Sequence, residues 1–446
     1  MHFDSPNCLA QCINPACRDQ VHCSAIDQYY DGLCNVCIDA ARAVFPKCKH
    51  KKFNRPRWKE RMGPFKEDAM FWDHVWKECG KPASGVVWEI RQRTKRTYHY
   101  EMRRYRKEEL DLRRDRMAEA IAESNDRNLW REVKKMAPHK GNPPAIDDET
   151  EDEAIAQIFA NKYEALFNSV PPDEGQMASI GHQVDALLQN ISNEDVSVSE
   201  EEVAVAIKRL KANKHDGRQA MWSNFILWAP RSMVIRLSSL IEAMLSHGYS
   251  PEGLNLAVVH PIPKKGDLCN SDNYRGIALS SCIAKLTELV LMAKSRDQIG
   301  TSELQFAYKK GHSTAMCTLM LKEIVTHYFN RGSDVYACFI DASKAFDRLR
   351  HDALFDILIE RHVPPAVIRI LLASYRNQHM CVRWRTMSSE KFKTENGVKQ
   401  GGIFSPVLFC LYVDALFDRL KDTEAGCHLG NKFVGALSYA DDLTLI

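Results

Sequence analysis

The sequence predicts an α+β fold for residues 244–446, with a mainly antiparallel sheet backed by helices, after a mainly helical N-terminal region. Two observations support this prediction. Short apolar runs typical of strands, such as those at 256–264 and 379–386, alternate with helical patterns in the C-terminal part. Nearer the N-terminus, apolar residues recur instead at the spacing of one helix face.

Composition and charge indicate a globular protein without a membrane span. The 446 residues are 45% hydrophobic and 27% charged, with a net charge of +3, and can form two or three domains. No run of eighteen apolar residues occurs, and the N-terminus lacks the pattern of a secretory signal. We therefore expect a protein that is not secreted and acts in the nucleus or cytoplasm, with mostly free thiols.

Shifts in composition divide the chain into three parts. Residues 1–150 are rich in cysteine and then basic, and they predict a helical connector region. Residues 137–153 combine paired prolines with a run of acidic side chains, which is typical of a linker. Residues 151–243 predict a helical extension that leads into the α+β part at 244–446.

The basic stretch lies at residues 91–116, where eleven Lys or Arg residues stand against five Asp or Glu residues. Tyr98, Tyr100 and Tyr105 interleave with these cations. Basic side chains neutralise phosphates and tyrosine rings stack on bases, so the stretch fits nucleic-acid binding. A solvated face of a long helix explains the same pattern equally well.

The cysteines are concentrated near the N-terminus, with eight of the fifteen before residue 80. Only Cys34 and Cys37 have the two-residue gap that is common among zinc ligands, and no matching second pair follows. We therefore favour scattered thiols on helices over a zinc site. The cysteines considered as zinc ligands are Cys8, Cys12, Cys17, Cys23, Cys34, Cys37 and Cys48.

Two helices are predicted in the extension. The apolar residues expected on one face of the first helix are Ile155, Ile158, Phe159, Tyr163 and Phe167. Ser199 and Glu202 form a capping box at the start of the second helix. Its last turn carries basic side chains, which suit the helix dipole and could also meet nucleic-acid phosphates. These basic residues are Lys208, Arg209 and Lys211.

Two strand-like runs lead into carboxylates. One ends at Asp341, and another reaches Asp441–Asp442 before apolar residues resume at once. Two residues between apolar strands predict a tight hairpin with both carboxylates at its tip. An isolated Asp–Asp pair is usually a solvated turn. Together with a strand-end aspartate, however, it suits two Mg²⁺ ions that assist a phosphoryl transfer.

Five segments then resemble, in the family's order, the reverse transcriptase domain of non-LTR (LINE-type) retrotransposons. They are HPIPKKGDLCNSDNYRGIALSS (260–281), QFAYKKGHST (305–314), FIDASKAFD (339–347), GVKQGGIFSP (397–406) and YADD (439–442). LKANKHDGRQA (210–220) resembles in part the family's upstream extension. The resemblance implies a right-hand polymerase with palm and fingers. Family members continue beyond the YADD hairpin, so we expect a C-terminally truncated fragment without a thumb and with weak or no processive synthesis.

The resemblance also implies the catalytic roles. Asp341, Asp441 and Asp442 match the metal-binding triad, and the carbonyl of Ala342 would be a further ligand for two Mg²⁺ ions, with Mn²⁺ as an alternative. Asp442 would contact metal less directly than the other two. Tyr439 would pack near the primer terminus.

Five further residues match the family's nucleotide pocket. Lys264 and Arg275 would hold the triphosphate, and Phe346 would be the steric gate that excludes a 2′-hydroxyl. Gln400 and Gly401 would line the pocket of template and nucleotide. Ordinary structural roles remain open for each, such as a core position for Phe346 and a turn at Gly401.

The implied partners are an RNA template, a DNA primer and deoxynucleoside triphosphates. Asp347 is expected to be structural and paired with Arg348 or Arg350. The implied function is an RNA-directed DNA polymerase that transfers a nucleotide to a primer 3′-hydroxyl. The alternatives are a catalytically inactive nucleic-acid-binding remnant and a maturase of the group II intron type.

Overall fold

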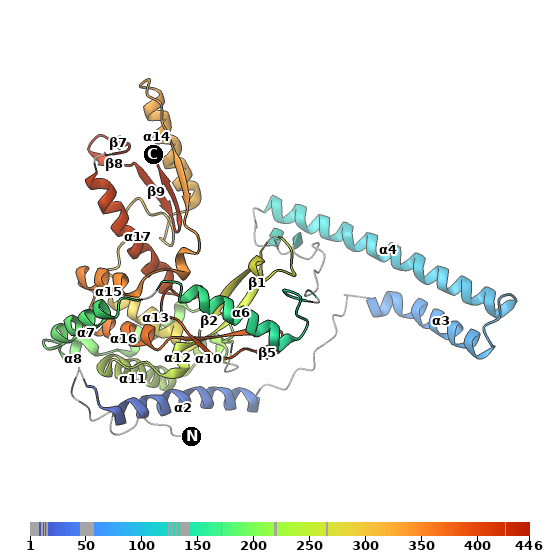
Figure 1. Cartoon of the computed structure of the whole chain (residues 1–446). Coiled ribbons are helices and arrows are strands. Elements are labelled where there is room, and N and C mark those ends of the chain that lie inside the picture. The colour runs from blue at the N-terminus through green and yellow to red at the C-terminus, as the bar shows by residue number, and fades with distance from the viewer. Residues whose placement is uncertain are drawn as a thin grey trace. The chain divides into compact units, whose positions relative to one another are not determined.

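The computed structural model separates the chain into two compact units, residues 1–45 with 143–446 and residues 46–142. It describes residues 9, 12, 14, 17–44, 58–123, 125, 128–130, 132, 133, 143, 145–170, 172–217, 221–264, 266–423 and 425–446, with the backbone alone at 58–61, 109, 110, 112 and 113. Figure 1 shows the chain with its elements labelled. Among these residues no helix is long and apolar enough to cross a membrane.

The first unit contains most of the regular structure. Its helices are α2 (Gln20–Val44), α6 (Asp152–Phe167), α7 (Glu174–Leu188), α8 (Asn193–Val196), α9 (Glu200–Arg209), α10 (Ser223–Leu227), α11 (Arg231–His247), α12 (Glu252–Asn255), α13 (Cys282–Lys294), α14 (Thr314–Phe329), α15 (His351–Glu360), α16 (Pro365–Arg376) and α17 (Ser405–Asp422). Its strands are β1 (Leu256–Pro263), β2 (Tyr274–Leu279), β3 (Cys338–Asp341), β4 (His379–Trp384), β5 (Met387–Ser388), β6 (Phe392–Lys393), β7 (His428–Leu429), β8 (Lys432–Phe433), β9 (Ala436–Tyr439) and β10 (Asp442–Leu445). The mixture confirms an α+β fold.

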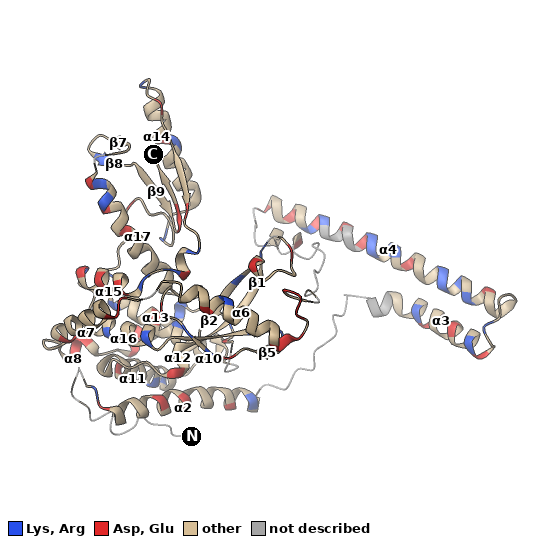
Figure 2. Cartoon of the chain, viewed as in Figure 1, with Lys and Arg blue, Asp and Glu red and all other residues tan. Residues whose placement is uncertain are grey.

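The second unit is a helical hairpin of α3 (Trp58–Glu78) and α4 (Val86–Ala122). Gly80 adopts a φ of 77° just after α3, as is common for a glycine that ends a helix. Arg91 of α4 lies 3.7 Å from the centre of the Trp76 ring and donates to Asp73 over 2.8 Å. Lys and Arg residues recur along α4 in Figure 2, as both interpretations of the basic stretch require.

A five-stranded sheet with α6 packed on it lies in the first unit (Figure 1). β1 pairs with β2 antiparallel and with β4 parallel, so the prediction of a mainly antiparallel sheet holds with one parallel pair. The predicted apolar face of α6 is confirmed, since Phe159 and Tyr163 are buried against Tyr274 and Trp384. This packing fixes α6 beside the sheet.

The predicted linker differs from the structure after residue 144. Ile146 is fully buried in the core beneath α6. The Asp147 N–H donates to Cys269 over 2.8 Å, and its carboxylate accepts from the Ser271 N–H over 3.0 Å. Acidic composition therefore marks a turn anchored to the segment before β2 rather than an exposed connection. Residues 137–142 of the prediction lie outside the described residues.

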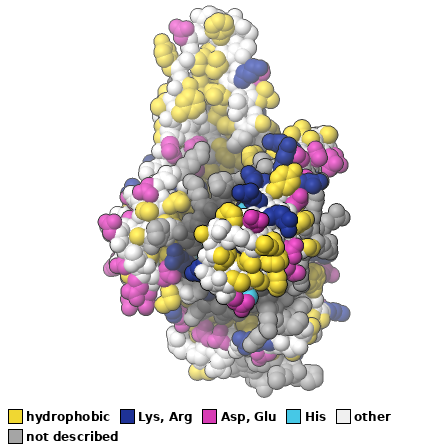
Figure 3. Space-filling model, turned by 90° about the vertical axis from the view of Figure 1, so that its right-hand side faces the viewer, with side chains coloured by type: hydrophobic (Ala, Val, Ile, Leu, Met, Phe, Trp, Pro, Cys, Tyr) yellow, Lys and Arg dark blue, Asp and Glu magenta, His cyan; other side chains and the backbone are white. Residues whose placement is uncertain are grey.

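A three-stranded antiparallel sheet in the order β3–β10–β9 forms separately from the larger sheet. Side chains of α14 and α17 pack against β9 in a third hydrophobic cluster. β3 is an edge strand of this sheet, and its side chains are exposed. Figure 3 shows hydrophobic side chains gathered on the upper part of the molecule, which holds α14. Large exposed hydrophobic residues on these elements include Leu319, Val325, Phe329, Phe339 and Ile340.

The largest core is helical and includes α2, α7, α9, α11, α13, α15, α16 and α17. The capping box of Ser199 and Glu202 is confirmed at the start of α9. Pro365 begins α16, as expected for a proline in the first turn of a helix. Tyr30 and Leu33 of α2 are buried in this core, so the N-terminal helix belongs to the first unit.

Candidate active site

Three aspartates converge at one end of the three-stranded sheet. Asp341 is the last residue of β3 and lies directly opposite Asp442, the first residue of β10. Directly opposite residues of antiparallel strands share one face of the sheet. Asp441 occupies the turn that joins β9 to β10. Asp341, Asp441 and Asp442 are called the carboxylate cluster below.

The hairpin turn is displaced by one residue from the prediction. Tyr439 pairs with Asp442, so the two turn residues are Ala440 and Asp441. The prediction of both aspartates at the tip is therefore wrong, because Asp442 begins the returning strand. Ala440 adopts a φ of 60°, a region that disfavours residues with a Cβ by about 1–2 kcal/mol. Neighbouring contacts must hold this conformation.

Gln305 supplies these contacts from within the core. Its side chain is fully buried and accepts the N–H of Ala440 over 3.0 Å. Its amide group donates to the hydroxyl of Ser438 over 3.0 Å and to the carbonyl of Ala440 over 3.4 Å. The carboxamide also accepts the N–H of Ala307 over 3.0 Å. Sequence reasoning identified the segment 305–314 but assigned Gln305 no role, since a buried amide leaves no pattern in one sequence.

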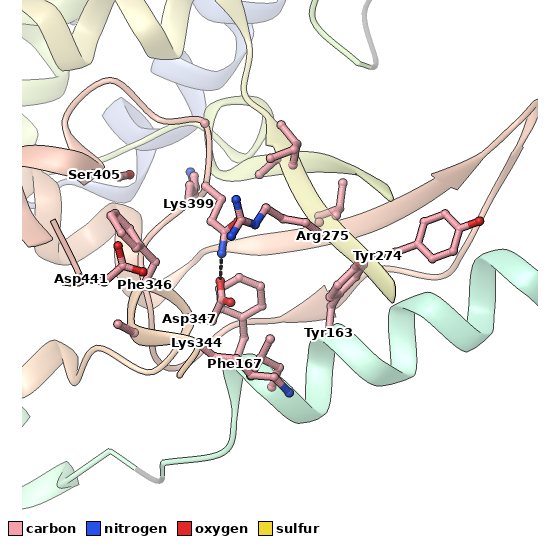
Figure 4. A pocket seen from close by; sticks show the side chains of 18 of the residues that line it. Tyr163, Phe167, Tyr274, Arg275, Lys344, Phe346, Asp347, Lys399, Ser405 and Asp441 are labelled. Atoms are coloured by element: carbon pink, nitrogen blue, oxygen red, sulfur yellow. Dashed lines mark hydrogen bonds between the residues drawn. The ribbon is translucent and has the colours of Figure 1, made fainter. Parts of the chain in front are cut away.

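A cavity of about 590 Å³ lies beside the carboxylate cluster (Figure 4). Its walls come from α6, β2, the loop after β3 and the start of α17. Tyr163 and Phe167 of α6 form an aromatic wall. The predicted site residues that line it are Asp341, Ala342, Asp441, Lys264, Arg275, Phe346, Gln400 and Gly401. Residues more than a hundred positions apart in sequence thus share one cavity.

Phe346 lines the cavity at the short helix after β3. Its ring stacks on Phe409 of α17, with ring centres 4.0 Å apart and planes inclined by 16°. Its carbonyl accepts the N–H of Val398 over 2.8 Å. The ring is therefore fixed from below by α17 and from the side by the segment before Gln400.

Asp347 is buried and positions Gln400 instead of pairing with an arginine. The Gln400 amide donates to the Asp347 carboxylate over 2.7 Å, the bond drawn in Figure 4. Arg350 instead donates to Asp352 over 3.0 Å, so the predicted pairing with Arg350 is wrong. Burial raises the pKa of Asp347 to about 6, partly opposed by Gln400 and the nearby cations.

Gly401 lies close to the backbone of Ala278 in β2. The carbonyl of Gln400 accepts the N–H of Ala278 in β2 over 2.9 Å. A Cβ at Gly401 would lie 2.3 Å from the carbonyl oxygen of Ala278, and its φ is 132°. Glycine is therefore needed here so that the loop can run against β2.

Several cations line the same cavity as Asp341 and Asp441. Lys264 and Arg275 lie on the β1–β2 side, and Lys344 lies in the loop after β3 with a φ of 57°. Lys162 pairs with Asp272 over 2.7 Å. Lys399 is buried, and burial lowers its pKa while Glu288 opposes the shift. Sequence reasoning missed Lys162, Lys344 and Lys399, because lysines without a distinctive spacing read as surface charges.

Other predicted residues lie elsewhere. Asp442 is exposed and Tyr439 is half-buried, and neither is among the described residues that line the cavity. Lys208, Arg209 and Lys211 are exposed at the end of α9 and just beyond it, also away from the cavity lining.

Residues 262–446 match the reverse transcriptase (RNA-dependent DNA polymerase) family. A Drosophila melanogaster Pol polyprotein from the type-2 retrotransposable element R2DM is 25% identical over 61% of this chain and 24% of its own length. A probable RNA-directed DNA polymerase from transposon BS of the same organism is 25% identical over 72% of this chain and 36% of its length.

A third relative is the RNA-directed DNA polymerase from the mobile element jockey of Drosophila funebris, which is 22% identical over 65% of this chain and 32% of its length. The chain thus spans about a quarter to a third of the length of these relatives. The match of residues 262–446, the order of the motifs and the carboxylates beside the cavity agree. The chain therefore carries a reverse transcriptase domain, related to those of non-LTR retrotransposons.

Proposed function

We propose that this chain is an RNA-directed DNA polymerase that adds deoxynucleotides to the 3′-hydroxyl of a DNA primer on an RNA template. The observation that carries the proposal is one cavity that is lined both by two aspartates, Asp341 and Asp441, and by cations. Cationic metal ions need anionic partners and an anionic triphosphate needs cationic ones, and this lining supplies both.

The donor set of the carboxylate cluster fits divalent metal ions. Carboxylate and carbonyl oxygens are the ligands that Mg²⁺ prefers, and Asp341, Ala342 and Asp441 present such oxygens to one cavity. We propose that these residues hold two Mg²⁺ ions, which Mn²⁺ could replace, with Asp442 as an indirect contributor. When bound, the ions would stabilise charge on the attacking and leaving oxygens of the transfer.

The cations that line the cavity would bind the triphosphate. Lys264, Arg275 and Lys344 line the same cavity, and together they offset charge on the phosphates and on the departing pyrophosphate. Lys162 is already paired with Asp272 and would bind less strongly.

Phe346 would select deoxynucleotides. An aromatic ring beneath the incoming sugar leaves no room for a 2′-hydroxyl. Its stack on Phe409 fixes the ring, so a ribonucleotide cannot push it aside without disturbing α17. Gln400, positioned by Asp347, would contact the base or sugar, with Gly401 forming the adjacent wall.

The remaining roles concern larger parts of the chain. We propose that residues 244–446 form the polymerase, with the five-stranded sheet as fingers and the three-stranded sheet as palm. Residues 151–243 would extend the polymerase, with Lys208, Arg209 and Lys211 contacting the template backbone, and Tyr439 would pack near the primer terminus. Residues 1–150 would be the connector, acting in the nucleus or cytoplasm.

Primer extension tests this function. The purified chain is given a poly(rA) template with an oligo(dT) primer, dTTP and Mg²⁺, beside Asp441→Asn. Asp418→Asn is the matched control, since Asp418 is an exposed aspartate of α17 that pairs with Lys421. We expect extension by the wild type and the control but not by Asp441→Asn. If the wild type binds the primed template but none of the three proteins extends the primer, the result favours a chain that binds nucleic acid without polymerase activity.

A further inference from the structure

Four potential metal ligands meet where the N-terminal segment reaches α11. Cys12, Cys17 and His22 come from the N-terminal segment and α2, and His247 is the last residue of α11. Their ligand atoms all lie within 4.8 Å of one another. The Cys17 sulfur is 3.4 Å from Nδ1 of His22, which is 3.1 Å from Nε2 of His247. These residues are called the Cys–His cluster below.

The donor set and its spacing match a structural zinc site. Two thiolates and two imidazoles are a common tetrahedral ligand set for Zn²⁺. Ligands at zinc bond lengths in a tetrahedron lie about 3.3–3.8 Å from one another. The separations of 3.4 Å between Cys17 and His22 and 3.1 Å between His22 and His247 are close to these values. Cys17 and His247 are buried, so the cluster is largely shielded from water.

Each histidine contacts a partner outside the cluster with one ring nitrogen. This contact turns its other ring nitrogen toward the cluster. Nδ1 of His247 lies 2.7 Å from the carbonyl of Ala243, and a carbonyl can only accept, so Nδ1 carries the proton. Nε2 then presents a lone pair to the cluster. For His22 the order is reversed, with Nε2 4.0 Å from the carboxylate of Asp19 and Nδ1 facing inward. Such outer partners orient zinc-bound histidines.

A backbone donor also contacts the cluster. The Asp19 N–H donates to the Cys17 sulfur over 3.5 Å.

Arg369 of α16 joins the two ligand-bearing segments through their backbones. Its guanidinium donates to the carbonyl of Cys17 over 2.6 Å and to that of His247 over 3.0 Å. Gly248, next to His247, has a φ of 55°, and a Cβ there would lie 2.1 Å from Arg369. The glycine makes room for the guanidinium, which holds the ligands near one another.

We propose that Cys12, Cys17, His22 and His247 bind one Zn²⁺ ion in a closed tetrahedral site. The site fastens the start of α2 to the end of α11, and it is independent of the proposed polymerase activity. Ligands from both segments would make metal binding part of the folding energy of this region. The rest of α2 is held by packing, through Tyr30 and Leu33.

Metal content tests the site. The chain is purified under reducing conditions with Zn²⁺ supplied, and bound metal is measured by inductively coupled plasma mass spectrometry. We expect one zinc per wild-type chain and at least about a 10-fold loss of bound zinc in Cys17→Ser and in His247→Gln. Cys37→Ser is the matched control and should keep its zinc, because Cys37 also lies on α2 but outside the Cys–His cluster.

A second measurement does not depend on the folding of variants. Zinc is removed from the wild type with a chelator, and Co²⁺ is added. The visible spectrum of tetrahedral cobalt with sulfur ligands should appear at one equivalent, and the thermal midpoint lowered by the chelator should recover with Zn²⁺. The proposal is overturned if the wild type binds no metal, if Cys12 and Cys17 are found as a disulfide, or if His247→Gln keeps its zinc with unchanged affinity.

Discussion

The carboxylate cluster and the Cys–His cluster are two ionisable centres with opposite designs. In the first, the hard oxygen atoms of Asp341 and Asp441 line a cavity of about 590 Å³. The second presents sulfur and nitrogen atoms to one another, with Cys17 and His247 buried. An open oxygen site suits catalysis, whereas a closed sulfur and nitrogen site suits structure. Ligand chemistry and solvent access together therefore indicate whether a cluster is catalytic or structural.

The largest expected effect separates the two clusters directly. Asp441→Asn removes a carboxylate charge from the cavity and should lower the rate of primer extension by about 10³-fold. Bound zinc should stay at one equivalent, because Asp441 lies outside the Cys–His cluster. Single-turnover extension and metal analysis on the same sample measure both. A variant that loses zinc along with activity would show that the centres are coupled.

The second-largest effect is expected for Gln305, whose side chain supports the turn that carries Asp441. Gln305→Leu would leave the N–H groups of Ala440 and Ala307 unsatisfied and release the turn that carries Asp441. We expect the free energy of unfolding in urea to fall by about 2–4 kcal/mol, with slower extension as well. Gln183→Leu changes an exposed glutamine of α7 and serves as the control. Equal losses in both variants would argue against a special role for Gln305.

Access to the open cavity gives the third prediction. Phe346→Ala would open the space under the sugar, and the preference for dTTP over UTP should fall by about 10- to 100-fold. Phe346→Tyr retains the ring and should retain the preference. The ratio of kcat/KM for the two nucleotides measures this effect. Unchanged discrimination in the alanine variant would assign Phe346 to core packing with Phe409.

The smallest effect concerns the buried carboxylate beside the cavity. The pKa of Asp347 is about 6 in the folded chain and about 3.9 in the unfolded chain, so folding favours its protonated form. Its contribution to stability is complete below pH 4 and is lost as pH rises through 6. The unfolding free energy of the wild type should therefore fall by about 2 kcal/mol relative to that of Asp347→Asn as the pH rises from 4 to 8. Urea unfolding across this range measures the difference, and a constant difference would contradict the shifted pKa.

The sequence predicted those features whose signals are local. The amphipathic pattern around Phe159 identified α6, and the segments around Asp341 and Asp441 identified the carboxylates. The turn was misplaced by one residue because strand pairing, not the Asp–Asp pair itself, decides where a hairpin turns. Similarly, the parallel pairing of β1 with β4 depends on contacts more than a hundred residues apart.

The Cys–His cluster was missed for the same physical reason. His22 follows Cys17 by five residues, but the fourth member, His247, lies 225 residues beyond His22. Spacing rules detect ligands within one short segment, whereas this site forms only when α2 packs on α11. Cys34 and Cys37, which have the more familiar spacing, are thiols whose pKa values are raised to about 12 and about 11, because Cys34 is buried and Cys37 is partly buried. Cys8 and Cys48 lie outside the described residues.

The most direct test of the two roles is a side-by-side measurement of primer extension and bound zinc in the wild type, Asp441→Asn and Cys17→Ser. We predict extension with one zinc in the wild type, no extension with one zinc in Asp441→Asn, and loss of zinc in Cys17→Ser. Extension by Asp441→Asn at the wild-type rate would contradict the assignment of the carboxylate cluster to catalysis.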